Sequence, residues 1–192
     1  MFFDDRQKVL VVSSSLKAED FIKNCLKDGY ISEYARSGAI ARQLLSGKEY
    51  DTVIINCPLK DEFGTDLAEN VIKNGYAGVM LLVKSEVFDD VSYAMEKAGV
   101  YTLAKPVSSS TFRQGLALTN ATAARLKGLA RKTENLQEKM EEIRLVARAK
   151  LLLITKLRFS EEEAHKYIEK RAMDECVKRK AIAFDVIKTY GD

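Results

Sequence analysis

The side chains best suited to bind a polyanion are concentrated near the end of this 192-residue chain. The densest group is Lys178-Arg179-Lys180, and the other candidates before it are Lys150, Lys156, Arg158, Lys166, Lys170 and Arg171. Residues 125–192 hold 17 Lys and Arg against 12 Asp and Glu, whereas residues 1–124 hold 14 against 16. Because basic groups attract phosphates, this asymmetry favours a nucleic-acid partner, although a solvated helical surface would show the same composition.

Patterns typical of catalysis or metal binding are missing from the sequence. His165 is the only histidine, and no nucleophile or metal-ligand pattern accompanies it. Cys25, Cys57 and Cys176 lie far apart and form no CxxC pair, which argues against a zinc site or a disulfide framework. We therefore expect no enzyme activity, no metal and no cofactor.

The sequence also lacks the features that direct a chain to a membrane. No apolar run is long enough to cross a bilayer, and acidic residues occupy the N-terminal stretch where a secretory signal would be basic. We therefore expect a cytoplasmic protein with no membrane partner.

The elements that must position the basic residues are helical. Ser160 followed by Glu163 is a capping box, which predicts the start of a helix. Within this helix, Ala164, Ile168 and Ala172 recur every four residues as one apolar stripe. A further helix is predicted near residues 180–190. With the end of the long helix that begins near Ser108, these segments could bury a small three-helix core.

The long helix carries a heptad pattern. Its apolar residues alternate at spacings of three and four, and those expected to form a dimer interface are Leu126, Leu129, Leu136, Met140 and Ile143. This pattern predicts a short parallel coiled coil between two chains, with Thr133 and Lys150 as polar positions within it. The alternative is a single amphipathic helix packed on its own domain.

Apolar runs alternate with helical segments in the first 105 residues. Strands are predicted at 8–12, 30–34, 51–56, 78–83 and 101–104, with helices at 18–27, 38–45, 66–74 and 88–98. This alternation predicts an α/β fold with a doubly wound parallel sheet, whose ligand site lies at the carboxyl ends of the strands.

Two short motifs in this region resemble the receiver domain of two-component response regulators. Leu103-Ala104-Lys105-Pro106 is similar to the Lys-Pro motif that ends the fifth strand in that family, and Gly64 follows Asn56 at the spacing of its phosphorylation loop. The resemblance implies a five-stranded, flavodoxin-like domain over residues 1–121.

Most residues that carry receiver chemistry are replaced in this chain, although Lys105 is retained. The matching positions, which form a degenerate phosphorylation site, are Ser13, Ser14, Asn56, Val83 and Lys105. Mg²⁺ requires carboxylate oxygens, and an amide is no nucleophile toward a phosphoryl donor. We therefore expect a pseudo-receiver that accepts no phosphate, so that its control must come from a protein partner, a ligand or the level of expression.

The C-terminal blocks Ala149-Lys150, Ser160–Ala164 and Ala172-Met173 resemble the ANTAR family of bacterial transcription antiterminators. The resemblance implies a coiled-coil helix over 122–148 and a three-helix RNA-binding domain over 149–192. It further implies a homodimer that binds two adjacent stem-loops in nascent mRNA and thereby allows RNA polymerase to read through a terminator.

Residues of the C-terminal helices, together with the basic residues named above, are the expected RNA contacts. Tyr167 could stack on an unpaired base, although a tyrosine beside Ile168 is more often part of the core. Ala172 and Met173 could allow close approach of the RNA backbone, or they could pack tightly against a neighbouring helix.

The sequence is also compatible with two other functions. A receiver-like domain often precedes a DNA-binding helix-turn-helix, but the last helix begins with Arg179-Lys180-Ala181-Ile182, which offers little besides charge to read bases. The other alternative is a non-catalytic dimeric adaptor that binds only proteins.

Overall fold

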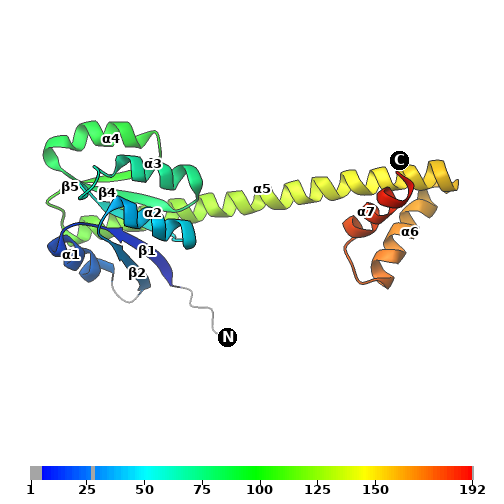
Figure 1. Ribbon diagram of the computed structural model, residues 1–192, viewed down its shortest axis with the longest axis horizontal. Helices are drawn as coiled ribbons and strands as arrows, with labels where there is room; N and C mark the ends of the chain where they lie inside the picture. The colour runs from blue at the N-terminus through cyan, green and yellow to red at the C-terminus, as the bar shows by residue number, and fades with distance from the viewer. Residues whose placement is uncertain (1–5, 27–28, 192) are drawn as a thin grey trace. The chain divides into compact units, whose positions relative to one another are not determined.

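The computed structural model describes residues 6–26 and 29–191. The chain divides into two compact units, Met1–Gly128 and Leu129–Asp192. The predicted parallel sheet is confirmed in the first unit, with the order β2-β1-β3-β4-β5 and parallel pairing throughout (Figure 1). Its strands are β1 (Gln7–Val12), β2 (Tyr30–Ala35), β3 (Thr52–Asn56), β4 (Gly78–Lys84) and β5 (Tyr101–Lys105).

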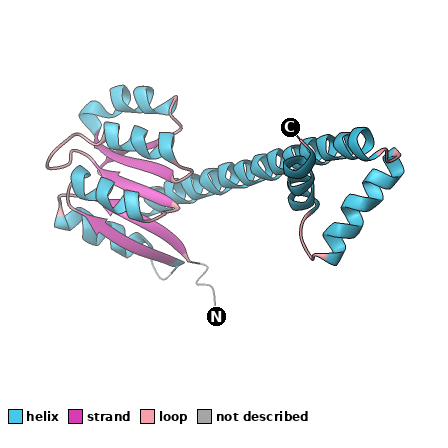
Figure 2. Ribbon diagram, turned by 45° about the vertical axis from the view of Figure 1, so that its right-hand side comes forward, coloured by secondary structure: helices cyan, strands magenta, loops and turns pink. Residues whose placement is uncertain are grey.

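Helices cover both faces of this sheet (Figure 2). They are α1 (Leu16–Leu26), α2 (Gly38–Gly47), α3 (Thr65–Asn74), the short 3-10 helix η2 (Ser85–Val87), α4 (Phe88–Glu96) and the start of α5 (Ser109–Leu157). One core lies beneath α2, α3 and α4 and includes Leu10 and Val53, whereas the other lies beneath α1 and α5 and includes Val9 and Ile54. Successive strand residues therefore enter opposite cores, which explains the uninterrupted apolar runs of the sequence.

Helix α5 begins in the first unit and ends in the second. Phe112 is buried on the sheet, and Asn120 joins the sheet through polar contacts. Thr52 Oγ1 donates a hydrogen bond to Asn120 Oδ1 at 2.5 Å, and Asn120 Nδ2 donates to the Tyr30 hydroxyl at 3.1 Å. Neither α5 nor any other helix in the described part of the chain is long and apolar enough to cross a membrane.

In the second unit, the end of α5 packs with α6 (Glu161–Asp174) and α7 (Arg179–Tyr190). The predicted capping box is confirmed: Ser160 Oγ accepts from the Glu163 amide at 3.2 Å, while the Ser160 amide donates to Glu163 Oε2 at 2.8 Å. The apolar stripe of α6 is also confirmed as core. The core of this unit consists of Ala149, Leu153, Ala164, Ile168, Ala172, Ile182, Ala183 and Val186.

The end of α6 contains a residue in an unfavourable backbone conformation. The amide of Cys176 donates to the Met173 carbonyl at 3.2 Å and that of Val177 to the Ala172 carbonyl at 3.0 Å, the pattern of a Schellman motif. Cys176 occupies the position of this motif that usually holds glycine, and its φ is +52°. A side chain with a Cβ is strained in this left-handed region.

Replacing Cys176 with glycine should therefore stabilise the second unit by about 1 kcal/mol, because glycine adopts this conformation without a clash. Urea unfolding followed by the helical signal at 222 nm measures the change. Cys176→Ala is the matched control, since it removes the thiol but keeps the Cβ. Equal stabilisation by both variants would contradict the backbone explanation.

Candidate functional site

Three residues of the degenerate phosphorylation site lie together at the carboxyl ends of β1, β3 and β5. Asn56 Nδ2 donates to Ser13 Oγ at 3.1 Å, and Lys105 Nζ donates to Asn56 Oδ1 at 2.8 Å and to the Cys57 carbonyl at 2.6 Å. Ser13 and Asn56 are buried, whereas Lys105 is half-buried. The ammonium can only donate, so its contact fixes the orientation of the Asn56 amide.

The two oxygens that Lys105 contacts belong to a side-chain amide and a backbone carbonyl, and neither is anionic. Burial lowers the pKa of Lys105, the Cys57 thiol opposes that effect, and the nearby Lys84 lowers the pKa further. Burial also raises the pKa of Cys57 to about 12, so this thiol stays protonated near neutral pH. The site therefore holds a cation among neutral hydrogen-bonding groups.

The prediction that Val83 belongs to this site is wrong. Val83 is fully buried in the core under α2, α3 and α4, on the face opposite Leu82. Because strand residues alternate between faces, Lys84 is the end residue of β4 that shares a face with Asn56 and Lys105. Because side chains alternate between the two faces of a strand, the sequence alone could have predicted that Lys84 lies on the same face of β4 as Leu82.

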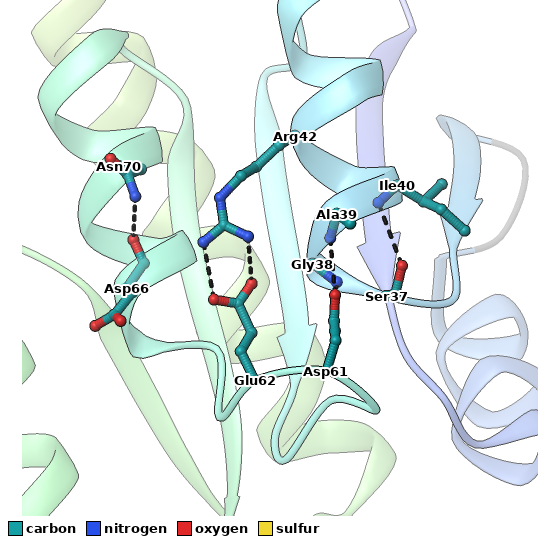
Figure 3. A network of polar contacts seen from close by, with 9 residues as sticks. All are labelled: Ser37, Gly38, Ala39, Ile40, Arg42, Asp61, Glu62, Asp66 and Asn70. Atoms are coloured by element: carbon teal, nitrogen blue, oxygen red, sulfur yellow. Dashed lines mark hydrogen bonds and ion pairs between the residues drawn. The ribbon is translucent and has the colours of Figure 1, made fainter.

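Two acidic side chains in the loop between β3 and α3 contact residues of α2 (Figure 3). The two carboxylate oxygens of Asp61 accept from the amides of Gly38 and Ala39, at 2.9 and 3.0 Å, at the start of α2. These backbone hydrogen bonds lower the pKa of Asp61. Glu62 forms a bidentate ion pair with Arg42, at 2.6 and 2.8 Å. Within residues 6–26 and 29–191, no group of three His, Cys, Asp or Glu residues could hold a metal ion.

Incubation of this protein with acetyl phosphate and Mg²⁺ should leave its intact mass unchanged, because the buried position that would take the phosphoryl group is an amide. Mass spectrometry of the intact chain tests this, with a phosphorylatable receiver domain as positive control. A gain of one phosphoryl group that disappears when a single aspartate is replaced would contradict the expectation.

Two basic residues of α6, Lys166 and Arg171, are held by nearby carboxylates. Lys166 pairs with Glu162 at 2.6 Å. Arg171 pairs with Glu175 at 2.7 Å and with Asp185 at 2.9 Å, and its guanidinium lies 5.9 Å from the centre of the Tyr167 ring. These carboxylates raise the pKa of Arg171, which therefore remains charged.

Tyr167 and Ala172 belong to the packing of the second unit. The Tyr167 ring meets Phe159 edge-on at 5.8 Å, and Ala172 is 9% exposed. Met173, by contrast, is 73% exposed. The tight-packing interpretation of Ala172 is thus supported by its burial, while Met173 lies at the surface.

The cluster Lys178-Arg179-Lys180 precedes and begins α7. Lys178 is exposed at the position before the helix, where its side chain makes no capping hydrogen bond. Arg179 pairs with Glu142 of α5 at 3.2 Å and lies 3.6 Å from Glu169. Lys180 pairs with Glu141 of α5 at 2.5 Å. Two members of the cluster thus face α5, and one faces solvent.

The remaining predicted contacts lie along the same unit. Lys150 pairs with Glu161 at 3.0 Å, and Arg158 follows α5 directly in a left-handed conformation with φ +59°. Lys156 lies in the last turn of α5, and Lys170 is exposed on α6.

One exposed aromatic side chain of this unit was not among the predicted RNA contacts. Phe184 is 62% exposed on α7, and the exposed Lys188 lies one helical turn further on. The buried residues Ile182, Ala183 and Val186 define the opposite face of the helix. Marking this buried face on a helical wheel could have identified Phe184 as an outward residue.

The heptad residues of α5 lie at the surface of a single chain. Leu126, Leu129, Leu136, Met140 and Ile143 are 50 to 68% exposed. Ile143 also lines a hollow of about 420 Å³, together with Val146, Ala147, Lys150, His165 and Arg179. A coiled coil that includes Ile143 would cover part of this hollow.

Residues 134–187 match the family model described as the ANTAR domain. The whole chain is also similar to the transcriptional regulatory protein PdtaR of Mycobacterium tuberculosis, strain H37Rv. The two are 28% identical over 187 residues, which cover 97% of this chain and 91% of PdtaR.

Solved structures resemble the first unit. The signal receiver domain of an HD domain-containing protein from Pseudomonas fluorescens Pf-5 superposes with a TM-score of 0.60 at 21% identity, covering 67% of this chain and 96% of that one. The chemotaxis response regulator CheY4 of Vibrio cholerae gives 0.54 at 20% identity, covering 59% and 98%. These likenesses show a receiver fold.

Proposed function

From the premise that this chain is a response-regulator-like protein of the ANTAR family, we propose that it regulates transcription by binding RNA. Its second unit binds hairpins in nascent mRNA, and two chains pair through α5 so that two adjacent hairpins are bound together. Binding opposes termination, and the first unit responds to a partner or ligand instead of phosphorylation. The ANTAR match over residues 134–187 is the observation that carries this proposal.

The surface of the second unit has the chemistry that RNA loops require. Proteins recognise RNA loops through basic side chains near the phosphates and aromatic rings that stack on unpaired bases. Lys178, Lys170 and Lys188 supply exposed charge, and Phe184 supplies an exposed ring on α7. Phe184 is a better stacking residue than Tyr167, whose ring already contacts Phe159.

The ion pairs between α7 and α5 modulate this binding. Arg179 and Lys180 pair with Glu142 and Glu141 on partly exposed surface. Such pairs are weak in water and screened by salt, so an RNA phosphate can replace the carboxylates. The glutamates then compete with RNA for the same cations.

Replacing Lys178, Arg179 and Lys180 with alanine should weaken binding of a two-hairpin RNA at least about tenfold at low salt and flatten its salt dependence. Fluorescence anisotropy at two salt concentrations measures this, with a DNA duplex of equal charge as the competing ligand. Tighter binding to the duplex would favour a DNA-binding regulator, and absence of binding to either would favour an adaptor.

Glu141→Gln combined with Glu142→Gln is the matched control for the alanine variant. It breaks the same two ion pairs but leaves the cations in place, so it should tighten RNA binding. If both variants weakened binding equally, the cluster would act by holding α7 to α5 and the proposed contact would be refuted.

A further inference from the structure

We infer that the hollow beside Asn56 in the first unit binds a small organic phosphate without a metal ion. The hollow has a volume of about 430 Å³ and opens at the carboxyl ends of β1, β3 and β5. This volume is in the range of small-molecule sites, and the carboxyl ends of parallel strands are where open α/β sheets bind ligands. The inference does not depend on RNA binding by the second unit.

The polar side of the hollow is cationic. Lys17 and Lys105 line it, Lys84 lies close enough to Lys105 to lower its pKa, and no Asp or Glu of the described chain is among the lining residues. A phosphate monoester carries a charge of about −1.5 to −2 at pH 7 and would offset these cations. Mg²⁺ would instead add positive charge where no carboxylate can bind it.

Lys105 has a donor left for such a ligand. An ammonium group has three N–H donors, and two of them are used by Asn56 Oδ1 and the Cys57 carbonyl. Within residues 6–26 and 29–191, no acceptor is found for the third donor or for the Ser14 hydroxyl, which also lines the hollow. The first turn of α1 lines the same side, so the positive end of its dipole adds to the attraction.

The rest of the hollow is apolar, which favours an organic ligand over inorganic phosphate. Phe21, Leu82 and Val107 form this part of the lining. The Phe21 ring is held edge-on against Phe112, with 5.6 Å between the ring centres. An inorganic ion would leave this apolar surface in water, whereas an organic group would cover it.

Titration of the full-length protein with phenyl phosphate in EDTA tests the inference, with inorganic phosphate and phenol as the two partial probes. We expect saturable changes in the amide NMR signals of Ser14, Lys17 and Asn56. Phenyl phosphate should bind at least about tenfold more tightly than phenol, because only the ester makes charge-assisted hydrogen bonds. Equal affinity for inorganic and phenyl phosphate would overturn the assignment to an organic ligand.

Two variants in the lining of the hollow locate the site, and a third variant outside it is the control. Lys105→Gln should weaken phenyl phosphate binding about tenfold through loss of a charge-assisted bond. Lys17→Gln, which leaves the contacts of Asn56 intact, should weaken it about threefold. Lys23→Gln removes one charge from α1 outside the hollow and should have no effect. No saturable binding by the unaltered protein, or equal weakening by Lys17→Gln and Lys23→Gln, would refute the site.

Discussion

Replacing Leu129 and Leu136 together by glutamine should lower the affinity for RNA carrying two adjacent hairpins by about 100-fold. Both side chains are more than half exposed in a single chain, at 51% and 61%, so their loss costs little core packing. Both occupy heptad positions of α5, and glutamine at these positions removes the apolar contact between two chains. Two unpaired RNA-binding units would then bind the hairpins independently.

Sedimentation equilibrium and anisotropy titrations measure this effect on assembly and on RNA affinity. Arg131→Gln combined with Glu138→Gln is the control, because it alters two exposed residues on the opposite side of α5 without changing net charge. Affinity for an RNA with one hairpin should be the same in all three proteins. If the variant with glutamine at positions 129 and 136 were monomeric but kept full affinity for the two-hairpin RNA, the role of chain pairing in RNA binding would be disproved.

Replacing Ile168 with alanine should destabilise the second unit by about 3 kcal/mol, because the substitution leaves a cavity in a small core. Ile168 is 1% exposed and lies among the buried residues of α5, α6 and α7. A loss of this size is a large fraction of the stability of a small domain, so RNA binding should be lost with the fold.

Met173→Ala is the matched control for this variant, since Met173 lies on the same helix and is 73% exposed. Its effect on stability should be within about 0.5 kcal/mol. Amide NMR signals distinguish the units: those of the sheet should persist in both variants, and those of α6 and α7 should collapse only in Ile168→Ala. A similar loss of stability in both variants would mean that the buried residues of α6, such as Ile168, do not hold this helix in the second unit.

The elements of the fold could be predicted because their signals are local. The apolar run at Val9–Val12 and the capping box at Ser160 identify a strand and a helix from a few neighbouring residues. The placement of Asn56 near Lys105 could also be predicted from the sequence, because parallel strands bring their carboxyl ends to one edge of the sheet.

What could not be predicted depends on partners far apart in the sequence. Arg179 and its partner Glu142 are 37 residues apart, so the charge pattern alone could not show that the basic cluster is partly neutralised. Asp61 likewise accepts a hydrogen bond from the amide of Gly38, which is 23 residues away in the sequence. This contact forms only because the fold brings the loop after β3 next to the start of α2. Val83 differs from these cases, because the alternation of side chains along β4 alone places it on the face opposite Leu82.

The amide of Asn56 also determines how long a signal received by the first unit could last. A covalently attached phosphoryl group persists until the bond is hydrolysed, independently of the concentration of its donor. A ligand held only by hydrogen bonds and charge leaves with its own dissociation rate, and occupancy then follows its concentration within the residence time. If the first unit responds to a ligand instead of phosphorylation, as we propose, its state follows the present ligand concentration and keeps no covalent record of earlier ones.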